Sequence, residues 1–348
     1  MKITDTIKYV GVNDETIDLF EGQYRMLHGV SYNSYVILDE KVAVMDTIDE
    51  RKTDEWFANL ENVLNGRTVD YLVISHLEPD HAANIKRAAD KFPQAQLVLS
   101  AKAKAMLPQF FDIAHLEERC LVVKEGDTLE LGTHKLHFVM APMVHWPEVM
   151  VEYDESDKIL FSADGFGRFG ALSQSCTYDA AGKAQDVLEH EWTGEARRYF
   201  INIVGKYGAN VQGLLKKAAV LDIEKIAPLH GPVLTGGLEY FLDKYAKWSS
   251  YQPEEKGVVV AYSSIHGNTK YVAEHFASIL KGQGEENVAV FDLARADMAQ
   301  AVADSFRYDA LVLAGITYDG GLMPCMEDFL YHLKMKNFQN RYAAVIEN

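Results

Sequence analysis

Cysteine is scarce in this sequence, and the three that occur, Cys120, Cys176 and Cys325, lie far apart. None of them forms a C-x-x-C pair, so the sequence indicates neither a disulfide framework nor an iron–sulfur or rubredoxin-type site. Long apolar runs are also missing, since none approaches the roughly 20 residues that a membrane-spanning helix needs. The opening residues MKITD have no apolar core of signal-peptide length. We therefore expect a protein of the reducing cytoplasm.

Positive charge is in deficit: 34 Lys and Arg stand against 51 Asp and Glu, which gives a net charge of −17. Such a balance argues against a nucleic-acid surface, which needs clustered basic residues, and against binding to anionic lipid. Hydrophobic content of 48% is ordinary for a globular protein. The 348 residues are enough for two domains, each with its own core.

Ligand-type side chains crowd into one short stretch, HLEPDH at residues 76–81. It follows the apolar run YLVI, which predicts a buried strand, and it precedes a predicted helix. In extended backbone, residues two apart point the same way, so His76, Glu78 and Asp80 can converge, and His81 joins them as the chain curls. Two imidazoles and two carboxylates in six residues predict a metal site.

In three later segments, a predicted strand is again followed by a possible metal ligand. His145 follows a predicted strand, Asp164 precedes a glycine on a tight turn, and His230 is likewise followed by glycine. The sequence thus offers seven candidate metal ligands, all at strand ends: His76, Glu78, Asp80, His81, His145, Asp164 and His230.

The ligand types narrow the choice of metal. Imidazole alone suits zinc, iron, copper or nickel, whereas carboxylates shift the preference toward harder ions. The stretch resembles the His-x-His-x-Asp-His pattern of zinc hydrolases of the metallo-β-lactamase superfamily, except that Glu78 replaces the second histidine. Glu78, Asp80, Asp164 and a bridging hydroxide would cancel the four positive charges of two ferrous ions. We therefore predict a di-iron centre.

Two further residues are candidate proton donors. His28 lies just before a predicted core strand and can reach the metal pocket as a supporting group. Tyr199 lies on a helical stretch predicted between residues 192 and 221, where ordinary packing explains it equally well. We interpret six other histidines as structural or surface residues: His115, His134, His137, His190, His275 and His332.

The order of the segments predicts two α/β domains. From residue 6 to 142, strands alternate with helices, including a hairpin of residues 31–38 and 42–46 and a helix over 49–65, which predicts a layered αββα unit. The polar stretch 249–256, which contains a proline, breaks the periodicity. We place the first domain at residues 1–250 and the second at 257–348.

The second domain opens with a strand at 257–262, the hydroxyl-rich turn SSIHGNT at 263–269 and a helix at 270–280. Backbone N–H groups, hydroxyls and a helix N-terminus make such a turn a phosphate cradle. It matches neither the Walker nor the dinucleotide pattern, and its few basic groups suit one phosphate monoester, as in FMN. After the third strand, at 309–315, the loop 317–321 supplies an aromatic for a flavin ring, at the switch point between strands 1 and 3. The predicted FMN-binding residues are Ser263, Ser264, Ile265, His266, Gly267, Asn268, Thr269, Thr317, Tyr318, Asp319, Gly320 and Gly321.

Taken in order, these motifs resemble those of the flavodiiron proteins (A-type flavoproteins) over essentially the whole length. The resemblance implies a metallo-β-lactamase-like di-iron domain fused to a flavodoxin-like FMN domain. It also implies that His76, Glu78 and His145 hold one iron, that Asp80, His81 and His230 hold the other, and that Asp164 bridges them. The implied activity is reduction of O2 to water or of NO to N2O. The implied electron donor is rubredoxin or a similar protein, and the implied assembly is a head-to-tail homodimer or a dimer of dimers.

One feature departs from that family. A flavodoxin-type sheet has five strands, but the sequence stops at 342–348, which we interpret as strand four. We therefore expect an incomplete doubly wound domain, C-terminally truncated, with an exposed strand edge and weakened FMN binding. A tight stoichiometric FMN complex would contradict this expectation. Two alternatives stay open: a di-zinc hydrolase of thioesters or lactams, and a flavin electron carrier without catalysis.

Overall fold

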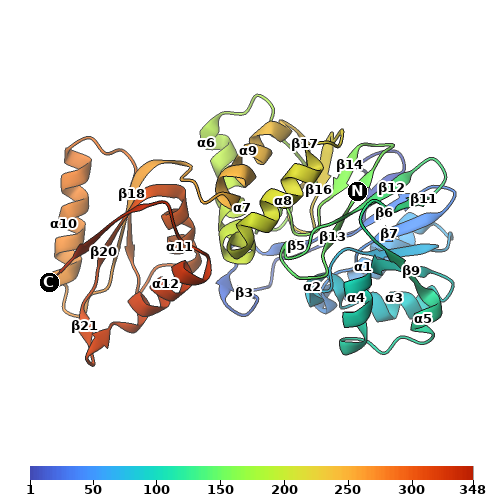
Figure 1. Ribbon diagram of the computed structural model, residues 1–348, viewed down its shortest axis with the longest axis horizontal. Helices are drawn as coiled ribbons and strands as arrows, with labels where there is room; N and C mark the ends of the chain where they lie inside the picture. Colours follow the sequence, from blue (N-terminus) through green and yellow to red (C-terminus); the bar gives the residue numbers. More distant parts are fainter. Residues whose placement is uncertain (348) are drawn as a thin grey trace. The chain divides into compact units, whose positions relative to one another are not determined.

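The computed structural model describes residues 1–347, which divide into two compact units (Figure 1). The first unit consists of residues 1–22, 26–196 and 210–242. The second unit consists of residues 23–25, 197–209 and those from 243 onward. No helix within residues 1–347 has both the length and the apolar character needed to cross a membrane.

Two β-sheets form the centre of the first unit. The six-stranded sheet has the order β1-β6-β7-β8-β9-β10, and the seven-stranded sheet has the order β11-β12-β13-β14-β16-β17-β15. The strands of the first sheet are β1 Ile7–Tyr9, β6 Tyr35–Leu38, β7 Val42–Met45, β8 Tyr71–Ile74, β9 Gln96–Ser100 and β10 Cys120–Val123. Those of the second are β11 Thr128–Glu130, β12 Lys135–Met140, β13 Met150–Asp154, β14 Ile159–Phe161, β15 Thr177–Asp179, β16 Lys225–Ala227 and β17 Val233–Gly236.

Shorter strands and the helices complete the chain up to residue 249. The short strands are β2 Val12–Asp14, β3 Leu19–Phe20, β4 Tyr24–Arg25 and β5 Val30–Tyr32. The helical segments are η1 Glu50–Lys52, α1 Thr53–Leu64, α2 Pro79–Ala82, α3 Ile85–Lys91, α4 Ala101–Met106, η2 Leu107–Gln109, α5 Leu116–Arg119, α6 Gln185–Leu188, η3 Glu189–Thr193, α7 Gly194–Tyr199, η4 Phe200–Val204, η5 Gly205–Tyr207, α8 Gly208–Ala218 and α9 Leu238–Ser249.

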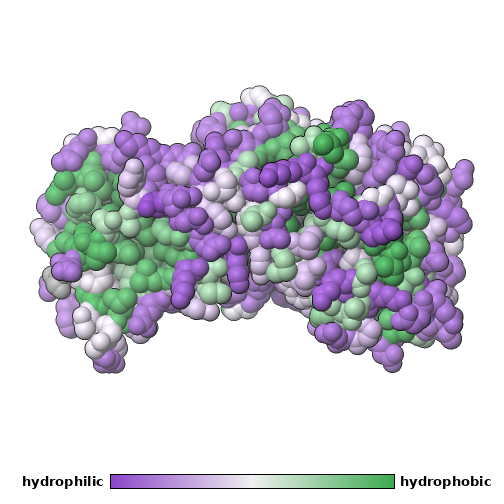
Figure 2. Space-filling model, in the orientation of Figure 1, coloured by the Kyte–Doolittle hydropathy of each residue, from purple (hydrophilic) through white to green (hydrophobic). Residues whose placement is uncertain are grey.

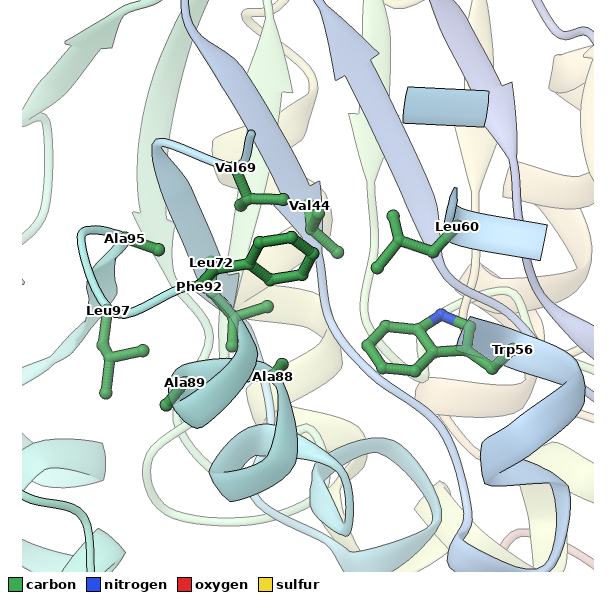
Figure 3. A pocket seen from close by; sticks show the side chains of 10 residues that line it. All are labelled: Val44, Trp56, Leu60, Val69, Leu72, Ala88, Ala89, Phe92, Ala95 and Leu97. Atoms are coloured by element: carbon green, nitrogen blue, oxygen red, sulfur yellow. The ribbon is translucent and has the colours of Figure 1, made fainter. Parts of the chain in front are cut away.

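The two sheets pack face to face over one apolar core. Side chains of the first sheet, such as Ile37 and Val73, and of the second, such as Phe138 and Ile159, belong to one buried cluster. On its other face the first sheet is covered by α1 and α3, and Trp56 of α1 is fully buried there (Figure 3). The small pocket of Figure 3 is lined by apolar side chains alone, so it is packing space rather than a reaction site. The predicted αββα arrangement is confirmed.

Two predicted elements are interrupted. The predicted strand 31–38 is in fact β5 and β6, which belong to different sheets. The chain changes sheet at Asn33, whose buried amide donates to the carbonyls of Pro228 and Gly231, both at 2.7 Å. The predicted helix 192–221 is likewise a series of short segments, with wide π-helical turns at η3 and η4. The hydrophobic periodicity of the sequence does not reveal these interruptions, because buried residues continue on both sides of each one.

The second unit contains a parallel sheet of four strands in the order β19-β18-β20-β23. Its remaining elements are β18 Glu255–Tyr262, α10 Asn268–Gly282, β19 Val288–Asp292, α11 Met298–Arg307, β20 Tyr308–Ala314, β21 Thr317–Tyr318, β22 Gly321–Leu322, α12 Pro324–Met335 and β23 Tyr342–Ile346. This is the flavodoxin-type order 2-1-3-4, as predicted. Asn348, the last residue of the predicted fourth strand, lies outside the described residues.

Strand β23 forms one edge of this sheet and is largely uncovered. Tyr342 is 79% exposed and Val345 69% exposed. Figure 2 shows apolar surface over the part of the second unit that carries β20 and β23. The expectation of an exposed strand edge is confirmed for this chain.

A buried ion cluster stabilises the second unit around Glu254, which is almost fully buried. Its carboxylate accepts from Arg197 Nη2 at 3.1 Å, from Lys244 Nζ at 2.9 Å and from Trp248 Nε1 at 2.6 Å. Burial alone would raise the pKa of Glu254, but Arg197 and Lys244 lower it from 4.5 to about 2. The carboxylate therefore stays ionised in the folded protein at pH values where the unfolded chain binds a proton.

We predict that Glu254→Gln lowers the free energy of unfolding at pH 7 by about 3–5 kcal/mol, because two cations stay buried beside a neutral partner. The pKa of Glu254 is lower in the folded state, so its contribution is complete above pH 4.5 and declines as the pH falls toward 2. Urea unfolding at pH 7 and pH 3 checks this.

The matched control for that experiment is Glu255→Gln, because Glu255 is partly exposed and pairs with Arg307. We expect it to change the free energy by less than about 1 kcal/mol. Equal effects of the two substitutions would contradict the role given to Glu254.

Candidate metal centre and flavin cradle

Four of the seven predicted ligands lie where β8 leads into α2. His76 is in the extended segment after β8, Glu78 is the residue before the helix, and Asp80 and His81 lie inside α2. The helix begins at Pro79, earlier than predicted, because proline fits the first helical position. The extended geometry predicted for the stretch therefore holds for His76 and Glu78 but not for Asp80, which lies in the helix. His81 lies where the chain curls, as expected. As a result, the two pairs of side chains face two different places.

The first pair of side chains meets His145 and Asp164. Glu78 Oε2 lies 3.2 Å from His76 Nε2 and 3.0 Å from His145 Nε2. Asp164 Oδ2 lies 3.3 Å from His76 Nε2 and 3.2 Å from His145 Nε2. Two imidazole nitrogens and two carboxylate oxygens thus surround one point, which we call cluster A.

The second pair meets His230. Asp80 Oδ2 lies 3.4 Å from His81 Nε2 and 3.2 Å from His230 Nε2, and the two ring nitrogens are 3.1 Å apart. The other oxygen of Asp164, Oδ1, lies 3.2 Å from His81 Nε2 and 3.8 Å from His230 Nε2. We call Asp80, His81 and His230 cluster B. Asp164 faces both clusters, one carboxylate oxygen toward each.

These distances fit two metal ions. Ligand atoms that sit about 2.0–2.2 Å from a common ion, at angles near 90–110°, are about 3.0–3.5 Å from one another. Several of these atoms are buried without a hydrogen-bond partner: both oxygens of Asp80, Asp164 Oδ1 and His145 Nε2. A buried acceptor without a partner is costly. Coordination of a cation in each cluster accounts for all of these atoms at once.

The electrostatics of the two clusters favour positive charge. Burial alone would lower the pKa of His76, but its bonds with Asp164, Glu148 and Glu78 raise it well above the ordinary value. Burial alone would raise the pKa of Asp164, but His81 and the other imidazoles hold it well below its usual range. A proton on His76 thus occupies the place of a cation, and metal binding would release it.

Contacts behind the ligands fix which ring nitrogen faces the clusters. His76 Nδ1 donates to Glu148 Oε1 at 2.8 Å, and the same oxygen accepts from Leu77 N at 2.9 Å. His230 Nδ1 donates to the carbonyl of Ser31 at 2.8 Å. Each Nε2 therefore keeps a lone pair for a metal, as is usual for metal-bound histidines. The role of Glu148 is apparent only in the fold, because its contact with His76 joins residues that are far apart in the sequence.

The turns that carry Asp164 and His230 each contain a glycine, but for different structural reasons. The left-handed residue beside Asp164 is Ala163 (φ 48°), whereas Gly165 is required by close packing, since a Cβ there would lie 2.9 Å from Ser162 O. Gly231 has a φ of 80°, and a Cβ there would lie 2.7 Å from Arg168 Cγ. Leu229 N donates to the carbonyl of Ala163 at 2.8 Å and ties the two turns together.

The two predicted proton donors are placed as follows. His28 is exposed, and its carbonyl accepts from Ala171 N at 2.7 Å. Among residues 1–347, His28 is not a member of the groups of clustered ligand atoms. Tyr199 is buried at the end of α7 and belongs to the second unit. Catalytic roles for His28 and Tyr199 stay predictions.

The predicted flavin residues lie at the carboxyl ends of β18 and β20, which are adjacent parallel strands. Ser263 N donates to Ala314 O at 2.9 Å, which brings the two following loops side by side. Ser263 is fully buried, and its Oγ lacks a hydrogen-bond partner. Helix α10 starts after Gly267 without a side-chain cap, and the N-terminus of a helix favours an anion. These features fit the phosphate of FMN.

The second predicted flavin loop forms a small hairpin. Strands β21 and β22 pair, and the turn between them uses left-handed Asp319 (φ 47°) and Gly320 (φ 79°). Tyr318 is 47% exposed, so its ring is available to a ligand. The residues that follow in this loop turn the chain into α12.

Comparison with known proteins agrees with the predicted folds of both domains. Residues 30–231 match the ODP family beta lactamase model, and residues 259–346 match a flavodoxin domain model. An anaerobic nitric oxide reductase flavorubredoxin of Salmonella arizonae is 30% identical over 348 residues, which cover 98% of this chain and 70% of the relative.

Two solved structures extend the likeness to three dimensions. The flavodiiron protein from Giardia intestinalis superposes with a TM-score of 0.89 at 27% identity, covering 99% of this chain and 82% of that one. Rubredoxin oxygen:oxidoreductase from Desulfovibrio gigas also gives 0.89, at 26% identity, covering 99% and 84%. With its paired histidine–carboxylate clusters and its flavodoxin-like sheet, the chain belongs to the flavodiiron protein family.

Proposed function

We propose that this protein is an oxidoreductase that reduces O2 to water, NO to N2O, or both, with a di-iron centre and FMN. The observation that carries the proposal is the position of Asp164, whose two oxygens face clusters A and B. Relatives support it, because one is named a nitric oxide reductase and another a rubredoxin oxygen:oxidoreductase. Electrons would come from rubredoxin or a similar donor.

The seven candidate ligands would bind two iron ions. His76, Glu78 and His145 would hold one iron, Asp80, His81 and His230 the other, and Asp164 would bridge them. When bound, the iron pair supplies a site that reduces a diatomic gas, with FMN as the source of further electrons. The chain's own residues exclude bulk water, since the four imidazoles are at most 8% exposed. Glu148 and the carbonyl of Ser31 keep His76 and His230 oriented.

The flavin domain would hold FMN between two loops. Ser263, Ser264, Thr269 and the N-terminus of α10 would bind the phosphate, and Tyr318 would lie against the ring. We propose the division at residues 250–257 between the iron and flavin domains. A head-to-tail homodimer, or a dimer of such dimers, would allow the FMN of one chain to serve the irons of its partner. A cytoplasmic location also stays a prediction.

The activity test is anaerobic. Iron- and FMN-loaded protein is reduced, mixed separately with O2 and with NO, and the loss of each gas is followed. We expect consumption of at least one gas, and no hydrolysis of a thioester or lactam by the same sample. Hydrolysis without gas consumption, from protein that binds zinc rather than iron, would instead support the di-zinc hydrolase.

A second prediction concerns Asp164, the carboxylate that faces both clusters. Asp164→Asn removes a charge that faces both clusters, so we expect it to lower the affinity of both irons by at least about 10-fold. His230→Gln touches cluster B alone and should leave one iron per chain. Iron analysis after dialysis checks both, with half-buried His137→Gln, outside both clusters, as the control that keeps two irons. Full retention of iron by Asp164→Asn would refute the bridging role.

A third prediction concerns Ser263. Its buried hydroxyl has no partner in the protein, so we expect it to donate to the FMN phosphate. A hydrogen bond to a charged group contributes about 1.5–3 kcal/mol, so Ser263→Ala should weaken FMN binding by about 10- to 100-fold. Fluorescence titration with FMN measures this. Ser278→Ala is the control, because Ser278 is exposed on α10 and bonds only the carbonyl of Glu274; equal affinities for all three proteins would exclude the role.

A further inference from the structure

A third group of metal-type ligands lies in the first unit, outside clusters A and B. It consists of His134, just before β12, Asp154, the last residue of β13, and Asp157 in the following turn. One donor atom of each lies within 4.8 Å of the others. We call these three residues cluster C. The sequence alone indicated that His134 is a structural histidine, but in the fold it lies beside two carboxylates.

Cluster C lies well away from the proposed iron site. Strands β12 and β13 run antiparallel from the pair Met140–Met150, beside the loop that carries His145, to the pair Leu136–Asp154 at the other end. Four residues of strand separate the two ends, which is about 13 Å. Cluster C is therefore a separate group at the opposite end of the second sheet.

The carboxylates of cluster C have buried oxygens without partners. Asp154 is fully buried. Its Oδ2 lies 3.0 Å from His134 Nδ1 and accepts from Asp157 N at 2.9 Å. Asp154 Oδ1 and Asp157 Oδ2 are buried and have no hydrogen-bond partner. Carboxylate oxygens in such a position are normally paired or bound to a metal.

Within the described residues, His134 is the one basic side chain that pairs with these acids. Among residues 1–347, no Lys or Arg forms an ion pair with Asp154 or Asp157. The neighbouring lysines are engaged elsewhere, Lys135 with Glu130 at 3.2 Å and Lys158 with Asp222 at 2.7 Å. A further carboxylate, Asp39, accepts from the backbone N of His134 at 2.6 Å and adds negative charge.

The second ring nitrogen of His134 is held in the way that metal-bound histidines usually are. His134 Nε2 lies 2.7 Å from Thr6 Oγ1. If Nε2 carries the proton and donates it to Thr6, Nδ1 keeps a lone pair directed at the carboxylates. An ion bound there would join the start of β12 to the end of β13 and the turn after it, and His134 would link them to the segment before β1 through Thr6.

We propose that cluster C is a separate site for one divalent cation, bound by His134 Nδ1 and by the carboxylates of Asp154 and Asp157. One imidazole with two carboxylates suits a Mn²⁺- or Fe²⁺-like ion rather than Ca²⁺ or Mg²⁺, which prefer oxygen alone. Its role is structural, because it ties the start of β12 to the end of β13 and the following turn, at the end of the sheet that is remote from the gas-reducing site.

The test uses the full chain with its iron sites already loaded, titrated anaerobically with Mn²⁺. Mn²⁺ ranks below Fe²⁺ in affinity for a given site, so it does not displace the irons. We expect one Mn²⁺ per chain, seen as loss of the free-ion EPR signal, together with a higher melting temperature. The variant Asp157→Asn should weaken this binding by at least about 10-fold.

The matched control is Glu155→Gln. Glu155 lies two residues from Asp157 in the same turn and carries the same charge, but its side chain pairs with half-buried His137 instead. It should bind Mn²⁺ with unchanged affinity and keep the melting shift. If the parent protein binds no Mn²⁺ beyond its irons, or if the two variants lose binding equally, the proposal is overturned. The three residues would then form only an internal imidazolium–carboxylate pair. Both results are independent of gas reduction, so they test cluster C alone.

Discussion

Asp164 is a single buried carboxylate with one oxygen directed at each of two histidine–carboxylate groups. That arrangement is possible only if the turn after β14 holds the side chain between the ends of two sheets. The turn is fixed by left-handed Ala163, by the close packing of Gly165 and by a backbone bond to the segment that carries His230. The fold brings the other ligands to this point, and none of them has to move for the two groups to share Asp164.

Burial makes this concentration of charge costly unless cations compensate it. Seven ionisable side chains meet with little exposure, and several of their atoms have no partner within the protein. Isolated ions in a protein interior cost many kcal/mol, so such groups are normally paired, protonated or bound to metal. In cluster B two imidazole nitrogens face each other, and at least one of them must lack a proton. A metal ion in each cluster resolves all of these conflicts, and the relatives of the chain are proteins of that kind.

The candidate ligands could be recognised in the sequence because they follow short apolar strands and lie close to turn-forming residues. His76, His145, Asp164 and His230 could be recognised in that way. The sequence could not reveal that α2 begins at Pro79, so it did not separate the pair Asp80 and His81 from the pair His76 and Glu78 by geometry. The division between two irons came from the family resemblance instead. Glu148 was also missed, because its role depends on a contact across 72 positions that no local pattern reports.

The central claim is that two irons lie on either side of Asp164. Anomalous diffraction at the iron absorption edge, from crystals of the iron-loaded chain, tests it most directly. The account predicts two separate peaks, one among His76, Glu78 and His145 and one among Asp80, His81 and His230, with Asp164 in contact with both. A single peak, or iron bound elsewhere while these side chains keep their places, would contradict it.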